Sequence, residues 1–386
     1  MPKKSEIVVQ ERDLRNNISR ENMKGVINIK QDNIHYNIDN IDSKNAIFNL
    51  ILGEKSGGKS YQVKHKKAVE HYLKTGQKFI LLRRWKDEIK TDKIEQYFND
   101  VDVEKLTDGV YNCITYWRGG IYFARFDNEK FKTIKGDKIG YAIALSQEQN
   151  YSSVSFLDVD NIIFEEFMSR TMYIAREPEK LMIFYDTVDR KRGAVKLWLV
   201  GNTISRVCPY LPAWDLQTTI QKMRQGDIIT KNIANSNNTI KLAIEYCRQT
   251  NQKSFAIGSS ETMISGGSWM STPQPHLSTS IKTYKPVIRV VFQYQSFMFL
   301  GTLYNKKDEL IWFICPKHTP IKKNTLVFGV ISENPLYSKD IYNMDFRIDA
   351  KIRDLIMKSF NESNIFYSTD LCGTDFKQCI DFSIRR

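Results

Sequence analysis

The sequence predicts an α/β protein: a larger first part built on a mostly parallel sheet, followed by a smaller α+β domain. Three observations lead to this prediction. An apolar run ends in a glycine-rich loop at 53–60. Short apolar runs then alternate with helix-like segments as far as about Pro212. A second apolar block, which begins at Val287, has the pattern of a meander of strands and indicates a separate unit.

The glycine-rich loop has the sequence G-E-K-S-G-G-K-S, which matches the phosphate-binding P-loop pattern. Its context agrees, because 46–52 is apolar enough for a buried parallel strand and 61–74 favours a helix that ends at Gly76. Glycines let the backbone direct several N–H groups at one anion. We expect Lys59 to reach the β- and γ-phosphates of ATP or GTP and Ser60 to bind Mg²⁺. The other expected nucleotide-binding residues are Gly53, Glu54, Lys55, Ser56, Gly57 and Gly58.

The segments after the P-loop helix follow the alternation of an α/β domain. The expected elements are a strand at 79–82, a helix at 87–99, a two-stranded ribbon at 110–117 and 121–126 with its turn at Arg118-Gly119-Gly120, a strand at 161–164, a helix at 177–189 and a strand at 195–200. The second part is expected to hold strands within 287–303, 310–315 and 325–331, and a helix around 350–360.

Composition divides the chain into four regions. Residues 1–40 are polar and predict an irregular or partly helical arm, and 41–230 form the P-loop domain. Residues 231–275 contain clusters of Ser, Gly and Thr and are expected to be a connector. Residues 276–386 form the second domain.

The bulk composition narrows the class of protein. The 386 residues are 41% hydrophobic, which is enough for a full core, and no run of 18 apolar residues predicts a membrane helix. The charged N-terminus lacks a signal sequence, so a cytoplasmic location is expected. Six scattered cysteines without a C-x-x-C pair give no indication of zinc. A formal charge of +13 indicates a polyanionic partner, with nucleic acid first, although lysine-rich coding could give the same excess.

Two adjacent acids end the strand expected at 161–164. Hydrolysis of a bound nucleotide needs one carboxylate near Mg²⁺ and a second that deprotonates the attacking water. The carboxyl ends of parallel strands are where open α/β sheets place such groups. We assign Glu165 to the magnesium side and Glu166 to the general base. The alternative is a solvated strand end without a catalytic role.

Three other polar positions are candidates for the same reaction. Asn202 follows the strand at 195–200 and could bond the γ-phosphate and the attacking water, or simply end the strand. Arg190 and Arg192 lie at a helix end, where they could complement the helix dipole or serve as an arginine finger for a neighbouring subunit. Lys86, in the basic and aromatic cluster R-R-W-K, could grip nucleic-acid phosphates or lie on a solvated loop.

Several segments together resemble the genome-packaging ATPases of small podophages with protein-primed DNA. They occur in the family's order and with similar spacing across most of 45–215. The segments are N-L-I-L-G-E-K-S-G-G-K-S-Y (49–61), F-I-L-L-R-R-W-K-D-E-I (79–89), N-I-I-F-E-E-F (161–167), D-T-V-D-R-K-R (186–192) and L-V-G-N-T-I-S-R-V-C-P-Y (199–210). The C-terminal block resembles the family more weakly, through Y-Q-S-F-M-F-L-G-T-L-Y (294–304).

The resemblance implies a P-loop NTPase of the ASCE type, with an additional strand and a catalytic glutamate, assembled as a pentameric ring at the portal of an empty capsid. It implies ATP and Mg²⁺ as cofactors and double-stranded DNA as the translocated partner. By motif match, Lys59 and Ser60 are the Walker A pair, Glu165 and Glu166 the Walker B acids, and Arg190 the trans-acting finger. Lys86 matches a DNA-gripping position.

The chain departs from the family pattern at two places. Glu165 stands where the family more often has Asp, and 147–153 lacks a lysine that relatives can place there. A second trans-acting basic residue is therefore not identified. The C-terminal domain resembles an RNase H-like nuclease without its active site, because 287–303 and 310–315 carry no acids of their own. We expect no nuclease activity there, and docking to DNA, portal or a structural packaging RNA.

The sequence thus predicts a viral DNA-packaging motor that acts in the host cytoplasm, sits transiently at the procapsid portal and is absent from the mature virion. Two alternatives remain open at this point. One is a cellular P-loop helicase or DNA pump. The other is a scaffold that binds nucleotide and nucleic acid without hydrolysis.

Overall fold

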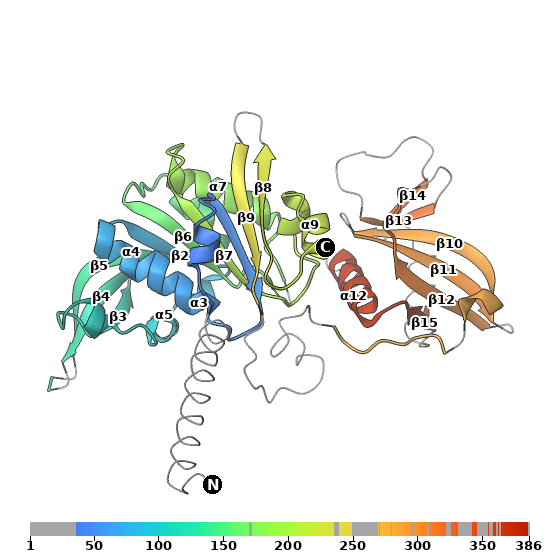
Figure 1. Cartoon of the computed structure of the whole chain (residues 1–386), viewed down its shortest axis with the longest axis horizontal. Helices are drawn as coiled ribbons and strands as arrows, with labels where there is room; N and C mark the ends of the chain where they lie inside the picture. The colour runs from blue at the N-terminus through green and yellow to red at the C-terminus, as the bar shows by residue number, and fades with distance from the viewer. Residues whose placement is uncertain are drawn as a thin grey trace, which may run out of the picture.

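The computed structural model describes the chain from residue 36 to residue 384, with gaps. The described residues are 36–127, 129–130, 132–169, 172–234, 239–248, 269, 271–278, 280–294, 297–306, 309–321, 326–330, 342–345, 354, 358–359, 362 and 364–384. Most of the expected arm at 1–40, and most of the helix expected around 350–360, lie outside these residues. The described strands form a nine-stranded and a six-stranded sheet, which lie in separate parts of the molecule (Figure 1).

The first sheet has the strand order β3-β4-β5-β2-β6-β7-β1-β9-β8. Neighbouring strands from β5 through β9 in this order run parallel, and the strands beyond them at both edges are antiparallel. The predicted mostly parallel sheet is therefore confirmed. The strands are β1 (Phe48–Gly53), β2 (Lys78–Arg83), β3 (Cys113–Trp117), β4 (Gly120–Asp127), β5 (Lys132–Ala144), β6 (Val159–Glu165), β7 (Lys196–Asn202), β8 (Ile228–Ala234) and β9 (Thr239–Tyr246).

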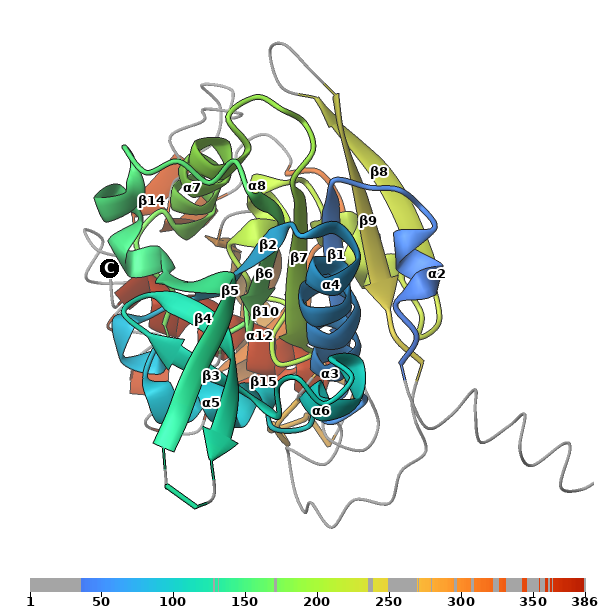
Figure 2. The same ribbon diagram turned by 90° about the vertical axis from the view of Figure 1, so that its left-hand side faces the viewer.

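Helices cover both faces of this sheet (Figure 2). Side chains alternate along the central strand: Leu50 and Leu52 join the core beneath α7, and Ile51 joins the core beneath the helix that follows the P-loop. Apolar side chains dominate both cores, which fixes the register of the strands. The helical segments are α2 (Asp39–Asp42), α3 (Lys59–Val63), η1 (Lys64–Val69), α4 (Glu70–Thr75), η2 (Lys86–Glu88), α5 (Thr91–Phe98), α6 (Val103–Leu106), η3 (Leu145–Tyr151), α7 (Glu177–Asp189), α8 (Tyr210–Ala213) and α9 (Gln217–Lys222).

Most predicted elements of the first part are confirmed. The helix after the P-loop runs through α3, a π-helical turn and α4 without interruption, and ends at Gly76 with a φ of +73°. Helix α7 has the predicted bounds because acidic residues and a proline begin it and Arg190, with a φ of +48°, ends it. The helix predicted at 87–99 is wrong at its start, since Lys86–Glu88 form a separate 3₁₀ turn and α5 begins only at Thr91.

Two further predictions need correction. The predicted ribbon is not two-stranded, because β5 adds a third strand that pairs with β4 and also with β2. The polar and largely exposed first half of β5 hides this strand in the sequence. The prediction of a connector at 231–275 is also wrong in its first part. Strands β8 and β9 extend the first sheet to Tyr246, and β9 pairs directly with β1.

The second sheet has the order β14-β13-β10-β11-β12-β15, with an antiparallel centre at β10, β11 and β12 as expected of a meander. Helix α12 (Asp370–Ile384), which the sequence did not suggest, packs against this sheet through Cys372, Phe376 and Cys379. Among the described residues, no helix is long and apolar enough to cross a membrane. The strands are β10 (Lys285–Tyr294), β11 (Phe297–Lys306), β12 (Glu309–Pro316), β13 (Leu326–Val330), β14 (Tyr342–Asp345) and β15 (Ile365–Tyr367).

Candidate functional site

Three parallel strands end side by side at the glycine-rich loop. β1 ends at Gly53, and the register of its pairing with β7 sets Gly53 opposite Asn202. The next strand, β6, ends at Glu165. A Cβ on Gly53 would lie 2.9 Å from the Cβ of Cys247, so this position has no room for a larger residue. Sheet topology thus gathers Gly53, Glu165 and Asn202 at one edge.

The P-loop lysine lies inside this group of strand ends. Lys59 is 5% exposed, and its ammonium donates hydrogen bonds to the backbone carbonyl of Glu54 and, at 3.2 Å, to Oδ1 of Asn202. Burial lowers the pKa of Lys59, and the nearby Cys247 and Glu165 partly oppose this effect. Asn202 is therefore placed beside the group expected to hold the terminal phosphates, as its proposed role requires.

The first acid faces the P-loop serine. Oε2 of Glu165 accepts a hydrogen bond from Oγ of Ser60 at 2.9 Å, and Oε1 accepts one from the hydroxyl of Tyr97 at 2.7 Å. Burial raises the pKa of Glu165, although both hydrogen bonds act in the opposite direction. A hydroxyl and a carboxylate that meet in this way are the oxygen ligands that Mg²⁺ uses together with water, so the residues fit this ion.

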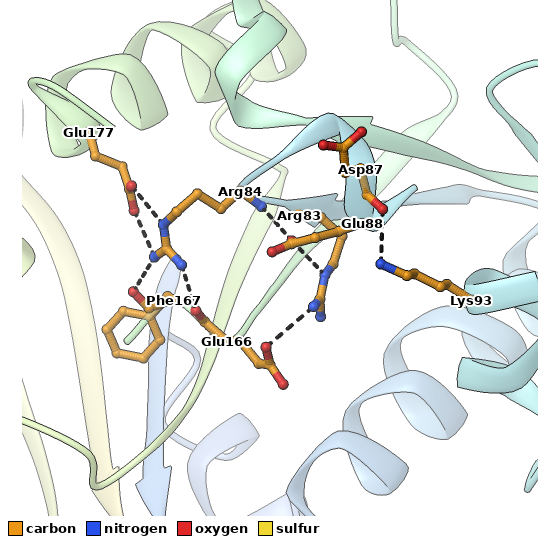
Figure 3. Close-up of polar contacts among 8 residues, drawn as sticks. All are labelled: Arg83, Arg84, Asp87, Glu88, Lys93, Glu166, Phe167 and Glu177. Atoms are coloured by element: carbon orange, nitrogen blue, oxygen red, sulfur yellow. Dashed lines mark hydrogen bonds and ion pairs between the residues drawn. The ribbon is translucent and has the colours of Figure 1, made fainter. Parts of the chain in front are cut away.

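The second acid points elsewhere. Glu166 has a φ of +55°, which turns the chain at the end of β6 and leaves its side chain 66% exposed. Its Oε2 lies 3.3 Å from Nη2 of Arg83, and Arg83 also donates from Nε to Glu88 at 3.1 Å (Figure 3). The structure therefore gathers Lys59, Ser60, Glu165 and Asn202, and holds Glu166 next to them in an ion pair with Arg83.

The remaining predicted residues lie on the surface. Arg190 is exposed at the end of α7 and donates to the carbonyl of Val154 at 3.1 Å. The guanidinium of Arg192 is used differently, because it donates to the carbonyls of Phe156, Leu157, Val159, Val188 and Asp189. Because these hydrogen bonds occupy the guanidinium of Arg192, Arg190 is the better candidate for contact with a neighbouring subunit. Lys86 is exposed in the 3₁₀ turn after β2.

Sequence reasoning missed four residues of this region: Arg83, Arg84, Tyr97 and Glu177. The sequence pattern places the two arginines only in a basic and aromatic cluster for phosphate contact. In the structure, Arg83 pairs with Glu166, and Arg84 is buried and forms a bidentate ion pair with Glu177 (Figure 3). Arg84 follows directly on the buried strand β2, which was the one available signal of its burial.

Comparisons with known proteins identify the family of this chain. The family described as podovirus DNA encapsidation protein (Gp16) matches residues 30–327. The DNA packaging protein of Bacillus phage B103 is 32% identical over 189 residues, which cover 47% of this chain and 51% of that protein. The DNA packaging protein of Bacillus phage phi29 is 31% identical over 192 residues, which cover 49% of this chain and 52% of that protein. The chain thus matches about half the length of these relatives.

A solved structure extends the likeness at the level of the fold. A chain of the bacteriophage phi29 viral genome packaging motor assembly superposes with a TM-score of 0.54 at 19% identity, covering 91% of this chain and 99% of that chain. The family match spans far more than half of the 386 residues. The chain is therefore a member of the podovirus DNA encapsidation protein family.

Proposed function

We propose that this chain is the ATP-hydrolysing subunit of a viral motor that moves double-stranded DNA through a portal into an empty procapsid. One observation carries the hydrolytic part of this proposal: the P-loop Ser60 and the strand-end Glu165 meet at 2.9 Å, with Lys59 and Asn202 beside them. The family match and the DNA packaging proteins among the relatives support DNA as the translocated molecule.

The residues divide the work of hydrolysis as follows. The loop 53–58 and Lys59 bind the phosphates of ATP, while Ser60 and Glu165 would hold Mg²⁺. Bound Mg²⁺ neutralises charge on the phosphates and orients the terminal one. Glu166 accepts the proton of the attacking water, which requires its carboxylate to leave Arg83. Asn202 bonds the terminal phosphate and changes its contacts when that phosphate departs.

Strand order supports the finer assignment of both domains. β7 lies between the P-loop strand β1 and the acidic strand β6. A strand in this place is the additional strand of an ASCE ATPase. In the second sheet, β10, β11 and β12 are antiparallel, while β13 pairs parallel with β10 and β14 pairs parallel with β13. This order supports an RNase H-like domain. We expect no nuclease activity, because Glu309 is the only acid in β10, β11 and β12.

The proposal includes a ring. The exposed Arg190 would reach the nucleotide of a neighbouring subunit, and Lys86 would contact the DNA backbone. A pentamer, the portal and a structural packaging RNA are the further partners that we propose from the family resemblance. The place of action would be the host cytoplasm, at the procapsid portal during assembly and not in the mature virion.

The test is ATP hydrolysis with and without double-stranded DNA. Glu166→Gln should bind ATP and lose hydrolysis by at least about 100-fold, and Arg190→Ala should lose DNA-stimulated hydrolysis. A mixture of the two variants should recover part of the activity, since a Glu166→Gln subunit supplies its Arg190 to a neighbour. Lys191→Ala is the matched control, because it removes a charge from the same helix end.

Each alternative predicts a different result. A scaffold would show no difference between Glu166→Gln and the original chain. Full activity of Arg190→Ala would exclude the trans-acting finger. A helicase would displace a strand from a forked duplex, which a packaging translocase does not do. DNA movement itself is measured by protection of DNA from nuclease inside procapsids.

A further inference from the structure

The backbone at the second acid is held in a conformation that glutamate seldom adopts. Glu166 has a φ of +55°, in the left-handed region that costs free energy for residues other than glycine. This turn separates the two acids, so that Glu165 faces Ser60 while the side chain of Glu166 leaves the sheet. A conformation of this kind persists only where neighbouring groups hold it in place.

The guanidinium of Arg84 supplies such a hold. Its Nη1 donates to the carbonyl of Glu166 at 3.1 Å, and its Nη2 donates to the carbonyl of Phe167 at 2.6 Å (Figure 3). The amide of Phe167 bonds in turn to the carbonyl of Val200 in β7, at 3.3 Å. The turn that carries Glu166 is therefore tied to β2 on one side and to β7 on the other.

Arg84 is itself fixed by a fully buried carboxylate. Its Nε and Nη2 lie 2.8 and 2.9 Å from the two oxygens of Glu177. Glu177 also accepts hydrogen bonds from the hydroxyl of Tyr210 and from the amide of Ile174, both at 2.8 Å. The Arg84 side chain is 5% exposed and that of Glu177 is 0% exposed. Burial lowers the pKa of Arg84, but the hydrogen bonds and charge of Glu177 raise it more, so the arginine stays charged.

We infer that Arg84 is a positioning residue for ATP hydrolysis: it fixes the turn at Glu166 and Phe167, and Glu177 and Tyr210 fix Arg84. This inference rests on the proposed function, in which Glu166 is the general base. A role in stability alone explains the pair less well, because apolar residues of similar size stabilise a core as much as a buried ion pair does. Apolar residues could not bond the two carbonyls of the turn.

The fork of arginine is essential to this geometry. Four of its N–H···O contacts reach three different groups, namely the carboxylate of Glu177 and the carbonyls of Glu166 and Phe167. A lysine keeps the charge, but its donors radiate from one atom and cannot span these groups. Arg84→Lys therefore separates the positioning of Glu166 from the presence of a buried cation.

The decisive measurement is the split between ATP affinity and kcat in Arg84→Lys. We expect the Kd for a fluorescent ATP analogue to stay within about threefold, because the P-loop is unchanged, and kcat to fall by about 10- to 100-fold through the displaced base. Arg176→Lys is the matched control, since this arginine is exposed, lies next to Glu177 in sequence and pairs with Glu179. Its kcat should be unchanged.

A second variant covers the case in which Arg84→Lys fails to fold. Tyr210→Phe removes one hydrogen bond from Glu177 and no charge, and should lower kcat by about three- to tenfold with unchanged affinity. Unchanged kcat in a folded Arg84→Lys, or in Tyr210→Phe if Arg84→Lys is unfolded, overturns the inference. Glu166→Gln separates failure of this inference from failure of the proposed function. If Glu166→Gln is inactive while Arg84→Lys is fully active, only the positioning role of Arg84 is excluded. If Glu166→Gln is fully active, the proposed function is lost as well.

Discussion

Two adjacent arginines at the end of β2 form ion pairs in opposite surroundings. In the exposed pair, Arg83 and Glu166, the side chains are 19% and 66% exposed and one contact of 3.3 Å joins them. In the buried pair, Arg84 and Glu177, they are 5% and 0% exposed and two parallel hydrogen bonds join them. An exposed pair with one long contact can open at small cost, whereas a buried bidentate pair cannot.

The difference assigns two roles to similar chemistry. The exposed pair holds the carboxylate of the proposed base and must release it during each cycle. The buried pair holds the backbone of the same residue and should stay closed throughout. Because the turn that carries Glu166 does not move, its carboxylate can leave Arg83 and still meet the attacking water with reproducible geometry. Each of the following changes breaks or sharpens this comparison.

The largest effect is expected from breaking the buried pair on one side. Glu177→Leu leaves the guanidinium of Arg84 buried without its counter-charge, so the free energy of unfolding should fall by about 3–5 kcal/mol. Urea denaturation followed by tryptophan fluorescence measures this loss. The double variant Arg84→Met/Glu177→Leu should recover most of the stability but not the ATPase activity, because no group then bonds the carbonyl of Glu166. Recovery of both would show that the pair serves packing only.

The next largest effect is expected from Glu245, a buried carboxylate that bonds a tyrosine. Glu245 accepts a hydrogen bond of 2.7 Å from the neutral hydroxyl of Tyr36, and burial raises the pKa of Glu245 to about 7. A carboxyl group whose pKa is raised on folding stabilises the protein below its unfolded pKa of 4.5, and this stability is lost as the pH rises through about 7. Above that pH, Glu245 should contribute about 3 kcal/mol less to the free energy of unfolding than at low pH.

Glu245→Gln tests this dependence, because glutamine resembles the protonated acid. The variant should be more stable than the original chain at pH 8 and nearly equal to it at pH 4.5. Thermal unfolding at a series of pH values provides the measurement. Glu129→Gln, at an exposed position between β4 and β5, is the control for a simple change in net charge. Equal pH profiles for the original chain and Glu245→Gln would contradict the prediction.

How far the sequence could predict this region depends on how local each contact is. The P-loop lies within eight consecutive residues, and the ends of parallel strands meet by a general topological rule, so Lys59, Ser60, Glu165 and Asn202 could be brought together in advance. Arg84 and Glu177 are 93 positions apart, and Tyr97 and Glu165 are 68 apart. These contacts depend on which strands are neighbours and on how α5 and α7 pack, which no short motif records.

The same reasoning explains the errors in the fold. β5 and β9 each complete the parallel part of the sheet, but both begin with polar, exposed residues and become buried only in their second halves. A search for continuous apolar runs therefore finds β1, β2, β6 and β7 and passes over these two strands. The connector was placed too early for this reason.

The smallest effect on stability is expected from breaking the exposed pair. Arg83→Ala removes the exposed contact to Glu166 and a second, partly exposed ion pair with Glu88, so the free energy of unfolding should fall by at most about 1–2 kcal/mol. Activity should respond more strongly. If the ion pair with Arg83 keeps the carboxylate of Glu166 away from the attacking water until DNA binds, ATP hydrolysis by Arg83→Ala without DNA should rise by about fivefold. The stimulation by DNA should shrink by the same factor. Lys93→Ala is the matched control, since it removes a nearby exposed cation whose ammonium donates to the carbonyl of Asp87 (Figure 3). A fall of DNA-free hydrolysis in Arg83→Ala to the level of Glu166→Gln would show instead that Arg83 orients the base for reaction, so that both arginines would act on Glu166 in the same sense.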